Sequence, residues 1–233
     1  MAPRARTNGA RRRDRREDVI AVAIKIFNEK GYASASIQDV ADAVGVLKGS
    51  LYHYIDSKED LLARIFEESD AQSFALMEES RNQDLAAVER LRWFARSWSL
   101  WYLENIERAA IYVNEWKHLT GPRLKKVTAQ RHEYEQRVAE MIEDVMEAGE
   151  ASPDLDVRYA TFFILTAING LPTWYRRRGS DPAEHIADVY AEMIVGMVTC
   201  TAGSPAKAGT KATKSVRAKA LRPRAKGKRK AKA

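Results

Sequence analysis

Apolar residues recur every three or four positions through most of the chain, which is the spacing of one face of an α-helix. The last segment shows it most regularly, with Ile186, Val189, Tyr190, Met193 and Met197 in one stripe. No stretch shows the alternation of apolar and polar residues that marks a half-buried strand. The pattern predicts an all-α protein.

Capping and turn residues divide this pattern into successive helices. A first helix is expected over 15–30, two short helices on either side of Gly45, and another after Ser57. Longer helices are expected over residues 84–105, 107–119, 121–150, 156–178 and 181–198. Pro172 should kink one of them because it lacks an amide donor. At the start of the last, Asp181 should act as the cap, with Pro182 in the first turn.

The segment 36–55 carries the most specific pattern. Ser36 and Asp39 have the spacing of a capping box, which predicts a helix start. Gly45 ends that helix, because glycine adopts the left-handed conformation without steric cost. On the next helix Leu51 and Ile55 lie four residues apart and should pack against the first. This arrangement is a helix-turn-helix.

The outward positions of the second helix carry groups that bind DNA. Lysine, serine and tyrosine donate to phosphate, histidine reaches a phosphate or a base edge, and glycine lets the backbone approach closely. Lys58 stands in the first turn of the following helix, where free amides favour an anion. The candidate DNA-binding residues are Ser36, Lys48, Gly49, Ser50, Tyr52, His53 and Lys58.

These residues resemble the amino-terminal domain of the TetR/AcrR family of bacterial transcriptional regulators. The likeness rests on GVLKGSLYHY at 45–54, SKEDL at 57–61 and AIKIFNEKGY at 23–32. Ile55 stands where the family often has phenylalanine, and it keeps the apolar packing role. The resemblance implies a three-helix helix-turn-helix domain over 15–65 and a larger helical effector-binding and dimerisation domain over 66–200.

The resemblance also implies a mode of action. Helix-turn-helix proteins usually read two half-sites as a two-fold dimer. In the family the last two helices form the dimer interface, which implies a homodimer here through residues of about 156–200. That stripe also suits the core of a single subunit. The expected function is a repressor that binds a palindromic double-stranded DNA operator and is released by a small hydrophobic effector.

All five tryptophans fall within residues 93–174, outside the DNA-binding part. Aromatic stripes on helices form cores more often than ligand pockets, but the family places its effector pocket among these helices. The segments NEWKHL, QRHEYEQR, DLDVRYA and TWYRRRG also resemble a subset of the family that responds to acyl-CoA thioesters. The candidate pocket residues are Trp98, Trp101, Tyr102, Tyr112, Glu115, Trp116, Tyr134, Phe163, Asn169, Thr173, Trp174 and Arg176.

The net charge of +7 is distributed unevenly. Residues 1–18 carry seven arginines and three acids, residues 201–233 carry twelve basic residues and no acid, and residues 19–200 carry 20 basic and 29 acidic residues. We expect a disordered basic arm over 1–14, which either lies along the DNA backbone or in a narrow minor groove or serves only as a solubilising terminus. We also expect a disordered Lys/Ala-rich tail over 201–233 that is attracted to DNA mainly by counterion release. The alternative function is an architectural, largely non-specific DNA-binding protein dominated by these ends.

Other classes of function find little support in the sequence. The single cysteine, Cys200, excludes an intrachain disulfide framework and suits a reducing cytoplasm. The four histidines have no partners at metal-ligand spacing, and there is no nucleophile-elbow serine or phosphate loop. No apolar run reaches the length of a membrane span. We therefore expect a cytoplasmic protein with no cofactor, metal site or catalytic residues.

Overall fold

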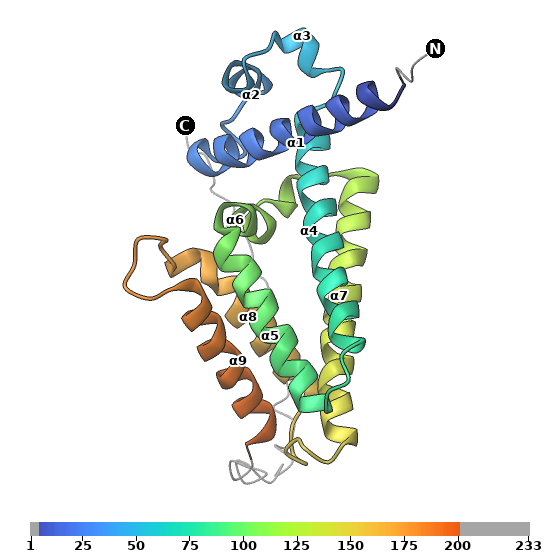
Figure 1. Ribbon diagram of the computed structural model, residues 1–233, viewed down its shortest axis with the longest axis vertical. Coiled ribbons are helices and arrows are strands. Elements are labelled where there is room, and N and C mark those ends of the chain that lie inside the picture. Colours follow the sequence, from blue (N-terminus) through green and yellow to red (C-terminus); the bar gives the residue numbers. More distant parts are fainter. Residues whose placement is uncertain (1–4, 201–233) are drawn as a thin grey trace, which may run out of the picture. The chain divides into compact units, whose positions relative to one another are not determined.

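The computed structural model describes the backbone of residues 5–200 and the side chains from residue 15 onward. This part of the chain is entirely helical, which confirms the predicted fold class (Figure 1). Its elements are α1 (Ala5–Lys30), α2 (Ile37–Val44), α3 (Lys48–Leu51), α4 (Lys58–Arg81), α5 (Ala87–Glu104), α6 (Ile106–Asn114), the 3-10 turn η1 (Trp116–His118), α7 (Gly121–Glu147), α8 (Val157–Trp174) and α9 (Ala183–Thr199).

Helix α1 begins ten residues earlier than predicted, so residues 5–14 of the expected disordered arm are helical. Alanine and arginine have high helix propensity, and extending an existing helix costs far less than nucleating one. Residues 1–4, the side chains of residues 5–14 and the predicted tail over 201–233 lie outside the described part of the protein.

Three other boundaries differ from the prediction. The segment 107–119 divides into α6 and η1, because His118 and Leu119 donate to carbonyls only three residues back. Helix α8 ends at Trp174, shortly after Pro172, which cannot donate to the carbonyl of Ile168. Asp181 makes no cap; Pro182 itself is the residue before the first turn of α9, with extended backbone.

The first three helices and the start of α4 enclose one apolar core, here called the DNA-binding core. Phe27 of α1, Val40 of α2, Leu51 of α3 and Phe66 of α4 are all essentially inaccessible to solvent. Ile111 and Tyr112 of α6 complete the same cluster, along with Leu119 and Val127. The DNA-binding domain therefore packs directly on α6 and α7.

A second cluster, here called the body core, lies among the remaining turns of α4 and helices α5, α7, α8 and α9. Met77, Phe94, Ile142, Ile164 and Ile194 represent those five helices in it. Helix α4 crosses both cores, and in Figure 1 it runs alongside α7 from the DNA-binding domain into the body. Helix α7 also contributes to both cores, with Val127 in the DNA-binding core and Ile142 in the body core.

Candidate functional site

The turn between α2 and α3 has the geometry that the sequence predicts. The Ser36 hydroxyl accepts from the Asp39 amide at 3.1 Å, and the Asp39 carboxylate accepts from the Ser36 amide at 2.8 Å, which confirms the capping box. Gly45 takes φ +74°, and the Val46 amide donates to the Ala41 carbonyl at 3.0 Å. This left-handed residue turns the chain sharply into α3.

Packing then decides which face of α3 meets solvent. Leu51 and Ile55 are buried against α2, as their spacing predicts. Lys48, Gly49, Tyr52 and His53 are exposed, and Ser50 is half-buried. Helix α3 is shorter than expected, so Tyr52 and His53 lie in the turn that follows it. The structure nevertheless brings these predicted DNA-binding residues together on one exposed surface, here called the α3 surface.

Leu47 also belongs to the α3 surface, and the sequence reading missed it. It immediately precedes α3, and 80% of its surface is exposed. An apolar side chain beside lysine and tyrosine is suited to contact a thymine methyl group in the major groove. Leu47 can be recognised in the sequence as a large apolar residue at the point where α3 begins, directly after the turn formed by Val44, Gly45 and Val46.

Lys58 points inward instead of toward a phosphate. Its Nζ donates to the carbonyls of Ala35 at 2.7 Å and Ala33 at 3.2 Å, and it lies 4.3 Å from the ring centre of Tyr32. Burial lowers the pKa of this lysine. Its contacts fix the loop before α2 onto the start of α4, so in this structure it positions the helix-turn-helix. Ser36, the other flanking candidate, is engaged in the capping box.

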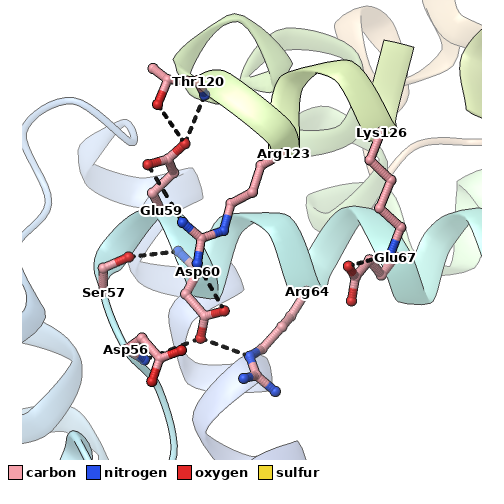
Figure 2. Close-up of polar contacts among 9 residues, drawn as sticks. All are labelled: Asp56, Ser57, Glu59, Asp60, Arg64, Glu67, Thr120, Arg123 and Lys126. Carbon is pink, nitrogen blue, oxygen red and sulfur yellow. Dashed lines mark hydrogen bonds and ion pairs between the residues drawn. The ribbon is translucent and has the colours of Figure 1, made fainter. Parts of the chain in front are cut away.

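A polar seam fastens α7 to the first three turns of α4 (Figure 2). Glu59 accepts from the Thr120 amide at 2.7 Å, where α7 begins, and this compensates the free amides of that helix end. Arg123 lies 3.5 Å from Asp60, and Lys126 pairs with Glu67 at 2.7 Å. These contacts connect the DNA-binding domain with the longest helix of the body.

In the body, the predicted pocket residues fall into two groups. The first forms an interior aromatic cluster, in which Trp98 stacks on Trp101 at 4.7 Å and lies 5.9 Å from Tyr134. Tyr102 is buried beside them and donates to Asn169 at 2.7 Å. Tyr112 is buried as well, and its ring lies 5.1 Å from that of Phe66 in the DNA-binding core.

The second group lies on the outside of the subunit. Phe163 is 58% exposed and Trp174 49%, and Thr173 and Arg176 are exposed beside them. The opposite face of α8 carries the smaller residues that pack in the body core, so the aromatic residues of this helix face away from it. Trp116 is at the surface, and the neighbouring Glu115 pairs with His118. These residues are not part of the interior cluster.

Two charged residues inside the body were missing from the sequence reading. Asp70 of α4 is buried and accepts from the Tyr112 hydroxyl at 2.7 Å. The guanidinium of Arg131 on α7 lies 5.7 Å from the ring centre of Tyr112 and 5.4 Å from that of Trp116. Asp70 interrupts the apolar positions Phe66, Phe74 and Met77 at helical spacing, which is the signal that would have found it.

Burial dominates the electrostatics of this region. It raises the pKa of Asp70 to about 6, although the hydrogen bond from Tyr112 opposes the shift. It raises the pKa of Tyr112 far above the usual range, and the adjacent Asp70 charge adds to the effect. Burial likewise raises the pKa of the Tyr102 and Tyr134 hydroxyls and holds both neutral.

A further apolar surface covers the outer faces of α8 and α9. Its exposed members are Tyr159, Phe162, Phe163, Trp174, Val189 and Met193, and Trp174 stacks on Tyr190 of α9 at 6.3 Å. We call it the α8–α9 surface. Large exposed apolar patches mark interaction sites more often than free surface.

An exposed short helix, held by a glycine turn against a buried partner and fused to a helical body, defines a helix-turn-helix transcriptional regulator. Residues 19–65 match the family model described as bacterial regulatory proteins of the tetR family, and residues 84–198 match the tetracyclin repressor-like carboxy-terminal domain. The chain belongs to the TetR family, whose members are transcriptional regulators and not enzymes.

This chain aligns with almost the full length of the relatives named here. The transcriptional repressor KstR2 of Mycolicibacterium smegmatis is 26% identical over 87% of this chain and 98% of its own. The structure of the ketosteroid transcriptional regulator KstR2 of Mycobacterium tuberculosis has a TM-score of 0.75 at 25% identity, covering 80% and 95% of the two chains. AibR, solved with isovaleryl coenzyme A and operator DNA, has a TM-score of 0.70 at 25% identity over 79% and 98%.

Two kinds of feature are absent from the described residues. No helix in that part of the chain is long and apolar enough to cross a membrane. No three histidine, cysteine, aspartate or glutamate side chains gather there in an arrangement suited to a metal ion.

Replacing Asp70 with asparagine keeps an oxygen acceptor for Tyr112 and removes the buried charge. The pKa of Asp70 is about 6 in the folded chain, against 3.8 for an unperturbed aspartate. Ionisation of Asp70 therefore lowers the free energy of unfolding: the loss is absent well below pH 4, grows as the pH rises, and is complete well above pH 6. We expect the gain in unfolding free energy from Asp70→Asn to be about 2 kcal/mol larger at pH 7.5 than at pH 4.5.

Urea unfolding of both proteins at the two pH values measures this difference. Glu67→Gln is the control, because Glu67 lies on the same helix and pairs with Lys126 at the surface. An Asp70→Asn gain that is the same at both pH values would contradict the prediction.

Proposed function

We propose that the protein is an effector-released repressor that binds a palindromic DNA operator as a homodimer. The observation that carries this proposal is the α3 surface, where Leu47, Lys48 and Tyr52 project from a domain whose fold is held rigid by a buried core. Selective contact with base edges needs side chains fixed in this way. The named repressor relatives support the same role.

The α8–α9 surface is the proposed dimer interface. An operator with two half-sites requires two α3 surfaces at a fixed separation, and a two-fold axis through one self-complementary surface supplies that separation. Phe163 and Met193 are the most exposed large apolar side chains of α8 and α9 respectively, apart from Tyr159. Pairing this surface with its copy removes it from water.

An acyl-CoA is the proposed effector class. AibR is similar to this chain over most of its length, and its structure holds isovaleryl coenzyme A. In this chain Arg176 and Arg177 line a cleft of about 350 Å³ together with Asn28, Glu107 and Pro172. Guanidinium groups bind phosphates well, so this cleft suits the nucleotide end of such a ligand. Asn169, one helical turn before Pro172, bonds to Tyr102 in the interior aromatic cluster.

A variant with Lys48→Ala and Tyr52→Ala tests the DNA-reading assignment. We expect its affinity for the best duplex selected from a random library to fall at least tenfold, since two contacts of about 1 kcal/mol each are lost. Fluorescence anisotropy with labelled duplex measures the change. Lys125→Ala, at an exposed position on α7, is the control. Unchanged affinity in the double variant would show that another surface reads the DNA.

Isovaleryl-CoA tests the effector class. At a hundred times its dissociation constant it should stabilise the full-length protein by about 2.7 kcal/mol, seen as a higher melting temperature, and should weaken operator binding. Free isovalerate and free coenzyme A are the controls, because each carries one end of the ligand. If none of them changes the melting temperature, the acyl-CoA assignment fails while the DNA-reading assignment is unaffected.

Charge placed on the α8–α9 surface tests the dimer. Phe163→Asp combined with Met193→Asp should give a monomer in light scattering, because two copies of each carboxylate would be buried at the interface. Lys125→Asp introduces the same residue at an exposed position on α7 and should leave the dimer intact. A double variant that remains dimeric would place the interface elsewhere.

A further inference from the structure

A layer of buried polar groups lies where the two apolar cores meet. On α4, Phe66 belongs to the DNA-binding core and Met77 to the body core, with Asp70 between them. Tyr112 of α6 packs in the DNA-binding core, and Tyr134 of α7 packs against the body core. We call this set the polar layer, and its members are Asp70, Tyr112, Gln130, Arg131 and Tyr134.

Several atoms of the polar layer are buried without a hydrogen-bond partner in the protein. Tyr112 occupies only one oxygen of Asp70, and the other, Oδ2, is unpaired although the side chain is 1% exposed. Gln130 Oε1 and Arg131 Nη1 are unpaired and buried as well, and the buried Tyr134 hydroxyl is approached by the Trp98 side chain without a hydrogen bond of good geometry. Most buried polar groups in proteins are paired, so four unpaired atoms on neighbouring helices call for an explanation.

Among the described residues, the buried atoms without a hydrogen-bond partner are concentrated in the polar layer. Tyr102, which is also buried, is satisfied by Asn169 at 2.7 Å. The other unpaired buried side-chain atom in the described residues is Ser99 Oγ. Ser99 follows Arg92 and Arg96 at helical spacing, so it shares their face of α5. These arginines pair with Glu192 and Asp188, so that face is directed toward α9 and not toward the polar layer. It serves as an internal reference for the polar layer.

The chemistry of the four unpaired atoms restricts what they can bind. Asp70 Oδ2 and Gln130 Oε1 accept hydrogen bonds, Arg131 Nη1 donates, and the tyrosine hydroxyl does either. A carboxylate would be attracted by Arg131 but repelled by Asp70, and an ammonium the reverse, so neither charge is matched by both groups and either must lose its hydration. An uncharged hydroxyl avoids both conflicts, because it donates to one side and accepts from the other.

The side chains beside the polar layer indicate what kind of molecule bears that hydroxyl group. Trp98 lies 5.9 Å from Tyr134, and Phe74 and Phe94 each lie 6.5 Å from it, ring centre to ring centre. Flat aromatic surfaces favour a ring, which packs on them in offset-stacked or edge-to-face geometry. We propose that the polar layer is a binding site for the hydroxyl group of an uncharged, ring-bearing alcohol, which rests on the proposed function because it describes the acyl end of the effector.

The position of this site gives it a route to the DNA-binding domain. One hydroxyl between Asp70, Arg131 and Tyr134 contacts α4 and α7 at once, and Tyr112 links Asp70 to α6. Helices α4 and α6 both pack on α1. A ligand that favours one arrangement of α4, α6 and α7 therefore biases the placement of the α3 surface.

A set of four probes with one ring and different head groups tests the proposal. Benzyl alcohol, toluene, phenylacetate and benzylammonium are titrated into the full-length protein and followed by saturation-transfer NMR. We expect benzyl alcohol to bind about fivefold more tightly than toluene, since one net hydrogen bond is gained, and both charged probes to bind more weakly than toluene.

Two variants locate the binding. Asp70→Leu removes the acceptor, and Tyr134→Phe removes only one hydroxyl from a ring that keeps its packing. Each should reduce the preference for benzyl alcohol over toluene to less than about twofold, while toluene itself binds as before. Ser99→Ala is the matched control, because among the described residues it deletes the one unpaired buried hydroxyl outside the polar layer. It should leave the preference for benzyl alcohol intact.

The outcomes separate this inference from the proposed function. No binding of any probe, equal affinity for benzyl alcohol and toluene, tighter binding of a charged probe, or a preference that survives both variants would each overturn the site. Operator binding by the unliganded protein is measured in parallel, because it requires the α3 surface and does not require a ligand in the polar layer. Its retention alongside a failed probe series overturns the alcohol site alone, and its absence alongside a successful series overturns the repressor role alone.

Discussion

The hydrogen bond from Tyr112 to Asp70 holds α6 to α4 at the level where the two apolar cores meet. On one side of it lies the DNA-binding core and on the other the body core, and α4 passes through both. Neither domain has a separate hinge segment in the described residues, because α4 continues as one helix from Lys58 to Arg81. The relation between the DNA-binding core and the body core therefore depends on how α4 packs at this polar level.

Local features of the fold follow from the sequence, and distant ones do not. The capping box of Ser36 and the left-handed Gly45 were predictable because their interactions span three or four residues. The contacts of Lys58 cannot be predicted from local spacing, because its partners, Ala33 and Ala35, lie more than twenty residues away. The exposure of Phe163 cannot be predicted either, because helical spacing shows which residues share a face and does not show whether that face is buried.

The DNA-binding domain gains little from bulk charge. Residues 19–60 contain four lysines and six acids. Two of the lysines are occupied within the fold, Lys30 by Asp39 and Lys58 by backbone carbonyls. In the proposed function Lys48 acts through its position on the α3 surface, and the many basic residues near the two chain ends supply the larger part of the sequence-independent attraction. The proposal thus assigns selectivity and overall affinity to different parts of the chain.

The polar seam of Figure 2 also sets the mechanical character of the joint between α4 and α7. Its outer pair, Lys126 with Glu67, is at the surface, where it adds little stability and is screened by salt, whereas Asp60, the partner of Arg123, is buried. The outer part of this joint therefore resists small displacements only weakly, whereas the apolar side chains packed beneath it in the DNA-binding core resist deformation strongly. The contact between α7 and the start of α4 should loosen at its outer edge as ionic strength rises, while the core beneath it keeps its packing.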